Sequence, residues 1–231
     1  MGVRARTAAA LATPYVLLLL STGCSDDVET ATEEPNERNG VGSLLSSEEA
    51  EAALPVASDL PAGWEDDPDK SAASDELSGR TTEPAECAAL LSLIALQPDN
   101  AAVDALASFV NRDEGTYLGV AVASYPSGEP DVVGYEAARD LVGRCGSFLT
   151  DEEGATYEYR ASLRSFAEFG DSTFAMRLSI PHEVYPFTAE RVAVNVDNHV
   201  VGVIGFSWGE TLDVDLIEQV TRVTVKNLDD L

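Results

Sequence analysis

The stretch that says most about the fold is VAVNVDNHVVGVI, residues 192–204. Two runs of β-branched and apolar residues flank Asp197 and Asn198, which are residue types that tolerate a positive φ. This pattern is typical of a β-hairpin with a two-residue turn. Gly202 and Gly205 in the second run indicate either a bulge or a close helix crossing. The stretch therefore predicts antiparallel sheet in the second half of the chain.

Strand patterns surround this hairpin in both directions. Runs rich in β-branched and aromatic residues, bounded by turn residues, predict six strands. They lie at 102–110, 116–125, 156–166, 173–180, 189–196 and 199–208. The last four follow one another with short connections, which predicts a four-strand meander.

Three segments have apolar residues at three- and four-residue intervals, as helices with one buried face do. They lie at 84–98, 131–145 and 213–228. The last begins near Asp213 and ends near Lys226, charges that complement the helix dipole. The order of elements predicts an α+β fold in which a single antiparallel sheet of about six strands packs with about three helices.

The first 23 residues have the features of an export signal. Arg4 and Arg6 precede an apolar run, 8–20, that is shorter than the roughly 20 residues needed to span a membrane. Three small residues then precede Cys24, as in a lipoprotein signal, although the usual leucine lies one place too early, at Leu20. We expect cleavage before Cys24 and its modification with diacylglyceryl and a second acyl chain such as palmitate, which together anchor stably. The alternative is an ordinary secretory signal with an incidental cysteine.

The mature chain is predicted to have two parts. Residues 24–57 are acidic and rich in Glu, Thr, Asn, Ser and Gly, so they cannot bury enough apolar area to offset their ordering entropy. They are expected to form a disordered tether, in which 46–54 makes at most a frayed helical turn or two. Residues 58–231 contain no internal repeat and no second linker, and we expect them to form one domain.

The chain is strongly acidic, with 41 Asp and Glu against 14 Lys and Arg and a net charge of −27. The leader holds two of the arginines and no acid, so the mature chain has 12 basic side chains and a net charge of −29. Nucleic-acid binding depends on Lys and Arg that neutralise phosphates, so this class of partner is excluded. Contact with the membrane is expected through the lipid on Cys24 rather than through the acidic surface.

Two cysteines remain if Cys24 carries lipid. Cys87 and Cys145 each fall on the apolar face of a predicted helix, and an even pair in an exported domain most simply forms one disulfide. The alternative is two buried free thiols. With only two scattered histidines, His182 and His199, these cysteines do not make a zinc site, and no metal or cofactor is expected.

Several short motifs together resemble the extracellular sensor domain of PknH-type mycobacterial kinases and the actinobacterial lipoproteins that share it. They are the Leu60-Pro61-Ala62-Gly63-Trp64 entry, Cys87 on the first helix, Cys145 closing the second, the Phe169-Gly170-Asp171 turn, the 191–208 hairpin and a C-terminal helix. The likeness covers about residues 58–231. It implies a sensor fold of two helices and a sheet with a central cleft and an unidentified ligand. That family commonly has two disulfides, whereas this chain has cysteines for one, and no fused kinase is expected.

The sequence carries few signs of catalysis. No Gly-x-Ser-x-Gly nucleophile elbow is expected, and a Walker loop, a Gly-x-Gly-x-x-Gly turn and a His-Glu-x-x-His pair are absent, so no catalytic residue is expected. The most distinctive surface feature is the loop IPHEVYPF, 180–187, because aromatic residues held between prolines can line a cleft or an interface. His182, Tyr185 and Phe187 are the candidate cleft or interface residues. The alternative is a loop that only covers the end of the sheet.

These observations favour a binding or sensor-type domain without catalytic activity. We expect it to be lipid-anchored in the cell envelope, on the outer face of the plasma membrane, with an unknown envelope ligand or protein as partner. One alternative is a carrier that holds a lipid or small molecule in an apolar cavity between sheet and helices. A hydrolase that uses His182 with a nearby carboxylate is a further alternative.

Overall fold

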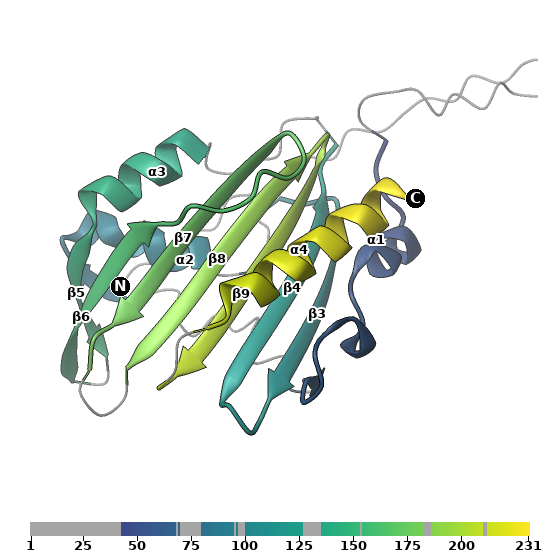
Figure 1. The fold of residues 1–231 in the computed structure, drawn as a ribbon. Helices are drawn as coiled ribbons and strands as arrows, with labels where there is room; N and C mark the ends of the chain where they lie inside the picture. Colours follow the sequence, from purple (N-terminus) through teal and green to yellow (C-terminus); the bar gives the residue numbers. More distant parts are fainter. Residues whose placement is uncertain are drawn as a thin grey trace, which may run out of the picture. The chain divides into compact units, whose positions relative to one another are not determined.

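A nine-stranded antiparallel sheet runs through the part of the chain that the structure describes (Figure 1). The structure, a computed structural model, describes residues 43–67, 69, 80–94, 96, 100–126, 135–152, 154–182, 186–209 and 212–231. All of these belong to one compact unit, Asn39–Leu231. The predicted signal, Cys24 and Tyr185 lie outside the described residues.

The strands follow the order β1-β3-β4-β9-β8-β7-β6-β5-β2. Their bounds are β1 Glu65–Asp66, β2 Thr81–Glu83, β3 Val103–Asn111, β4 Thr116–Ser124, β5 Ser147–Glu152, β6 Ala155–Leu163, β7 Ser172–Ile180, β8 Phe187–Val196 and β9 His199–Trp208. The predicted meander is the run β6-β7-β8-β9. Its last hairpin pairs Val196 with His199, and Asp197 between them has a φ of 52°. The α+β class and the single antiparallel sheet are confirmed.

The predicted number of strands is wrong, because the described residues form nine rather than about six. β1 and β2 have two and three residues, too few to show an alternating pattern. β5 starts directly after a helix, and its sequence SFLTDE ends in polar residues. The two shortest strands form the edges of the sheet, where a short strand limits pairing with other chains.

Four α-helices flank the sheet in the described residues, where about three were predicted. They are α1 Ser47–Ala53, α2 Ala88–Ile94, α3 Tyr135–Arg144 and α4 Val214–Asp229. None of the described helices is long and apolar enough to cross a membrane. Figure 1 shows α4 across one face of the sheet and α2 behind the other.

Helix α1 corrects the predicted boundary between tether and domain. The composition assigns residues 43–57 to the tether, yet α1 is part of the fold. The Glu49 N–H donates to Ser46 Oγ at 3.2 Å and the Ser46 N–H donates to Glu49 Oε2 at 2.8 Å, which caps the helix start. Ala50 and Ala53 are fully buried, because α1 packs against α4 and β3. The helical turns expected at 46–54 are therefore present as α1, but they pack on the domain instead of lying within a disordered tether.

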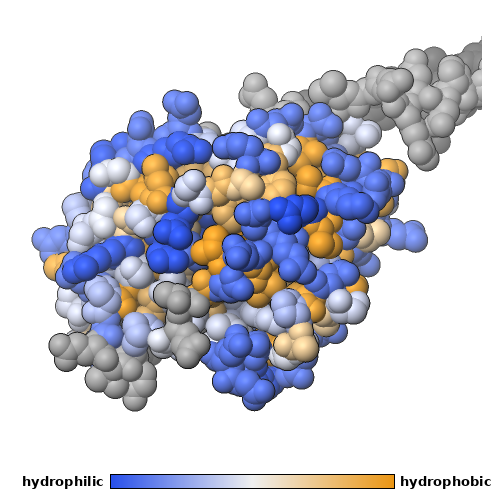
Figure 2. All heavy atoms as spheres, in the orientation of Figure 1, coloured by the Kyte–Doolittle hydropathy of each residue, from blue (hydrophilic) through white to orange (hydrophobic). Residues whose placement is uncertain are grey.

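The sheet separates two apolar cores. One lies on what we call the α2–α3 face and includes Leu90, Leu91, Ala138, Val142 and the sheet residues beneath them. The other lies on the α1–α4 face and includes Ala53, Leu216, Ile217, Val220 and a separate set of sheet residues. Figure 2, in the same view as Figure 1, shows hydrophilic residues over most of the visible surface, with apolar residues between them.

Candidate functional site

Neighbouring charged residues in β8 lie on opposite faces of the sheet. Ala189 belongs to the core of the α2–α3 face, so the alternation along a strand also places Arg191 on that face. Glu190 lies on the α1–α4 face. The cross-strand partners of Arg191 are Met176 and Ile204, both almost completely buried. A cation therefore lies within an apolar core.

The guanidinium of Arg191 is bonded to backbone carbonyls. Its Nε donates to the carbonyl oxygen of Leu93, in the last turn of α2, at 3.1 Å. Its Nη1 donates to the carbonyl oxygen of Val203 at 3.2 Å and to that of Val192. No bond from Nη2 to any described residue is recorded. Three of the five N–H groups are thus bonded within the described part of the chain.

Gly202 makes room for this side chain. A Cβ atom at Gly202 would lie 2.8 Å from Nη1 and 2.9 Å from Nη2 of Arg191. Distances below 3.0 Å are essentially never seen for real Cβ atoms, so any larger residue would displace the guanidinium. The sequence indicated a bulge or a close helix crossing at Gly202. In the structure this glycine instead allows the close approach of an arginine side chain.

The charge of Arg191 has no carboxylate partner among the described residues. Burial lowers the pKa of Arg191 from 12.5 to about 10, against a smaller opposing effect of Tyr135 and Tyr125. The group is therefore still protonated at neutral pH. The residue as a whole keeps partial solvent exposure. Burying a charge without a counter-ion costs free energy, so its presence calls for an explanation.

Tyr135, at the start of α3, belongs to the same region. Its hydroxyl donates to Asn195 Oδ1 at 2.9 Å, and its ring stacks on Phe174 at 5.9 Å between centroids. Burial raises the pKa of this hydroxyl. Asn195 in turn donates through Nδ2 to Ser172 at 3.2 Å. The tyrosine remains neutral and cannot balance the charge of Arg191.

Glu190 offers a contrast on the α1–α4 face. Its carboxylate pairs with Arg177 and lies 3.8 Å from Arg164 Nε. Burial raises the pKa of Glu190, and the two arginines act in the opposite direction. Glu190 and its two arginines therefore form a structural ion pair. Arg191, in contrast, has no oppositely charged partner among the described residues.

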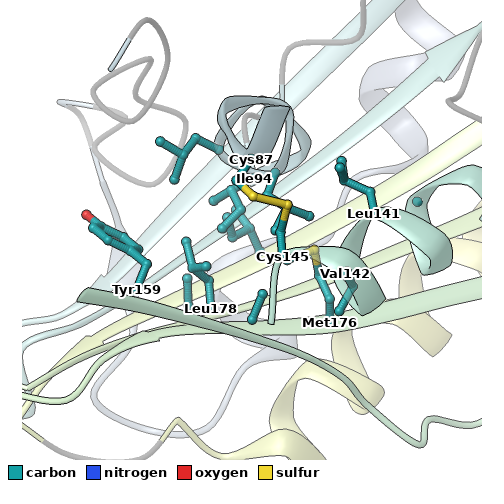
Figure 3. Packing of buried hydrophobic residues seen from close by; sticks show 14 of the residues in the cluster. Cys87, Ile94, Leu141, Val142, Cys145, Tyr159, Met176 and Leu178 are labelled. Carbon is teal, nitrogen blue, oxygen red and sulfur yellow. A yellow bond between two sulfur atoms is a disulfide. The ribbon is translucent and has the colours of Figure 1, made fainter. Parts of the chain in front are cut away.

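The predicted disulfide joins Cys87 to Cys145, with Cα atoms 5.6 Å apart. Cys87 ends the short 3₁₀ turn before α2, and Cys145 follows α3 directly. Figure 3 shows the bond between the two helices, packed with Ile94 and Val142 against the sheet. The bond holds together the helices that supply Leu93 and Tyr135 to the Arg191 region.

The candidate cleft residues are not gathered into one described site. His182 is exposed just after β7, and its backbone N–H donates to the carbonyl of Ile180 at 2.9 Å. Phe187 is buried in the core of the α2–α3 face, where its ring lies 5.8 Å from Phe206 and 4.7 Å from Trp208. Phe187 therefore contributes to the core of the α2–α3 face.

The expectation that the chain has no Gly-x-Ser-x-Gly motif is wrong at the level of the sequence. Residues 205–209 read GFSWG, which matches the Gly-x-Ser-x-Gly pattern of nucleophile elbows. That motif acts on a sharp strand-to-helix turn with an exposed serine. Here Ser207 lies within β9, paired with Thr116 and Thr188, and is fully buried. Among the described residues there is also no group of three or more His, Cys, Asp or Glu that could hold a metal ion.

Arg191 was missed as a site residue, although the sequence holds a signal for it. In AERVAVNV, Arg191 shares a strand face with Ala189 and Ala193, and the opposite face, with Val192 and Val194, is apolar too, so both faces of this strand can be buried. A charged residue at an inward position of an apolar strand needs a partner or a function. Which of the two applies depends on residues that lie far away in the sequence.

Comparison with known proteins adds information on the fold. No family model and no curated protein matches the chain. It is similar to the crystal structure of the extracellular domain of PknH from Mycobacterium tuberculosis, with a TM-score of 0.52, 13% identity, and 82% of this chain and 99% of that chain covered. It is also similar to an uncharacterized protein of Mycobacterium smegmatis, the Rv0999 ortholog, with a TM-score of 0.48, 16% identity, and 78% and 96% covered. The resemblance drawn from the sequence is confirmed at the level of the fold: the chain has the fold of a PknH-type extracellular sensor domain.

Proposed function

We propose that this protein is a lipid-anchored, extracytoplasmic binding domain of the sensor type, without catalytic activity. The observation that carries the proposal is Arg191, a cation buried on the α2–α3 face with no carboxylate partner among the described residues. A fold that only had to be stable would gain by an apolar residue at this position. A binding site, in contrast, needs a few polar groups within apolar walls.

Three features support the extracytoplasmic location. The leader and Cys24 have the pattern of a lipoprotein signal. A disulfide such as Cys87–Cys145 is typical of proteins in oxidising, extracytoplasmic compartments. The fold is shared with a domain that is itself extracellular.

Two features favour binding over hydrolysis. The serine of the GFSWG match is inaccessible within β9, so it cannot act as a nucleophile. His182 is exposed, which argues against a hydrolase that would use this histidine as its general base.

Native mass spectrometry of the protein extracted from membranes tests the proposal. We expect a bound small molecule in the wild type and its loss in Arg191→Met. The matched control is Arg139→Gln, which removes an exposed arginine of α3 whose Nη2 donates to the carbonyl of Thr173 at 3.1 Å. Retention of the same molecule by all three proteins, or its absence from the wild type, would contradict the proposal. Intact mass of the same sample shows whether Cys24 carries lipid.

A further inference from the structure

The residues just before α1 are bonded to the domain near the β8–β9 turn. Asn198 of this turn is almost completely buried, and its Nδ2 donates to the carbonyl oxygen of Ser43 at 3.2 Å and to that of Tyr125 at 2.9 Å. The Leu45 N–H donates to Ser124 Oγ, at the end of β4, at 3.2 Å. We call residues 43–53, which comprise this segment and α1, the strap. One side-chain amide and one hydroxyl therefore hold the start of the strap on the domain.

The same serine contacts a histidine. Ser124 is fully buried, and its Oγ lies 3.1 Å from Nδ1 of the half-buried His199. Because the Leu45 N–H can only donate to this oxygen, the hydroxyl hydrogen of Ser124 is left for Nδ1, which accepts it as the unprotonated nitrogen of a neutral imidazole. Strap, serine and histidine thus form one chain of hydrogen bonds.

A proton on His199 is incompatible with this chain. Nδ1 would become a donor, so Ser124 Oγ would face two N–H groups while its own hydrogen lost its acceptor, which is costly for a buried hydroxyl. Burial already lowers the pKa of His199, because a partly desolvated ring disfavours the charge. Departure of the strap would let water reach the ring. The state without the strap therefore binds the proton more readily, and a lower pH favours that state.

His199 is the group that can sense acid at this place. Histidine is the side chain whose ordinary pKa lies between pH 5 and pH 8. The charged group that acts on His199 is Asp197 in the same turn, and its effect is smaller than that of burial. Titratable groups on the strap, on the turn before β7, after β4 and at the end of α4 are not among those that act on it: Glu48, Glu49, Asp171, Tyr125, Lys226 and Asp230.

We propose that protonation of His199 releases the strap from the domain while the sheet stays folded. The fully buried residues of α1 are two alanines, so α1 buries only small side chains and little apolar contact opposes release. Release would lengthen the link to the anchor proposed at Cys24 by up to about 35 Å of extended chain. The inference concerns the reach of the domain and does not depend on which ligand it binds. The competing explanation is that the strap opens only when the whole domain unfolds.

Hydrogen–deuterium exchange of the full mature protein in a neutral detergent, at pH 7 and pH 5, separates the two explanations. Protection is corrected for the intrinsic exchange rate and compared between the strap and β8 in the middle of the sheet. We expect the strap to be at least about tenfold less protected than β8 at both pH values, as local opening predicts. In the wild type, its protection should fall by a further factor of about three or more at pH 5.

His199→Asn removes the titration and keeps an acceptor, because the amide oxygen can take the place of Nδ1. The protection of its strap should be the same at pH 7 and pH 5. The matched control is Asn227→Ala, which removes a bond to the carbonyl of Ala53 at 3.4 Å, at the other end of α1. This control should loosen the strap at both pH values and keep the threefold change.

A second variant covers the case in which His199→Asn changes the turn. Ser124→Ala removes the acceptor of the Leu45 N–H, so its strap should be less protected than that of the wild type already at pH 7. Strap protection equal to that of β8, the same strap protection at both pH values in the wild type, or an undiminished fall in His199→Asn would each overturn the inference. Strap protection in Ser124→Ala equal to that of the wild type would also overturn it.

Discussion

Gly170 and Gly115 have similar backbone conformations in different surroundings. Their φ values are 52° and 61°, both in the left-handed region. A Cβ at Gly170 would overlap the carbonyl oxygen of Asn195, while a Cβ at Gly115 would meet nothing within 4 Å. We expect Gly115→Ala to lower the free energy of unfolding by about 1 kcal/mol through backbone strain alone. Gly170→Ala should cost about 3 kcal/mol or more, because the turn must also move. Urea denaturation measures both, and equal losses would contradict the difference.

His199 makes the stability depend on pH. It lies at the β8–β9 turn with Nδ1 3.1 Å from Ser124 Oγ, and burial lowers its pKa below the usual 6.5, against a smaller effect of Asp197. Between the pKa of His199 in the folded protein and the higher pKa in the unfolded chain, the unfolded chain binds more protons than the folded one. The free energy of unfolding therefore falls as the pH is lowered through this range. We expect His199→Gln to remove part of this loss between about pH 7 and pH 5.

Thermal unfolding of the wild type and His199→Gln across this pH range measures the effect. The same pH profile for both proteins would show that burial of His199 is not the cause.

Arg191 and Glu190 should respond differently to neutralisation. Arg191→Met replaces a cation that has no carboxylate partner among the described residues, so its free energy of unfolding should equal or exceed that of the wild type. Glu190→Gln leaves Arg177 without its carboxylate, and we expect a loss of about 2 kcal/mol. Urea denaturation at neutral pH tests the pair. A large loss in Arg191→Met alone would favour a structural role for this arginine.

At the scale of elements, the disulfide ties α2 to α3 across a separation of 58 residues. A loop of this length stabilises the folded state by about 4 kcal/mol in the chain-entropy model. The Cys87→Ala, Cys145→Ala double variant should therefore unfold at a lower urea concentration than the oxidised wild type. Reductant should lower the midpoint of the wild type and leave the double variant unchanged. Equal midpoints for oxidised wild type and double variant would contradict the expected stabilisation.

The elements that the sequence predicts well have a strong local pattern. The β8–β9 hairpin has alternating apolar residues and a two-residue turn, and α4 has its buried residues at helical spacing. The elements that it misses lack such a pattern. β1 and β2 have two and three residues, too few to show an alternating pattern.

At the scale of the whole molecule, the acidic surface opposes the compact state. Self-repulsion among many carboxylates weakens as salt screens it. We expect the melting temperature to rise by a few degrees between roughly 10 and 500 mM NaCl. KCl should act equally, because screening does not depend on the cation. A rise with one salt only would indicate a specific ion site instead.

The sequence by itself determined the α+β class, six of the nine strands, three of the helices and the pairing of Cys87 with Cys145. These features follow from local periodicity, turn chemistry and the count of cysteines, all of which act over short stretches or need no geometry. Only the tertiary structure decided the Arg191 site. Arg191 meets the carbonyl of Leu93 across 98 residues and lies against Gly202 of the next strand, and contacts of this kind arise when distant segments pack on one face of the sheet.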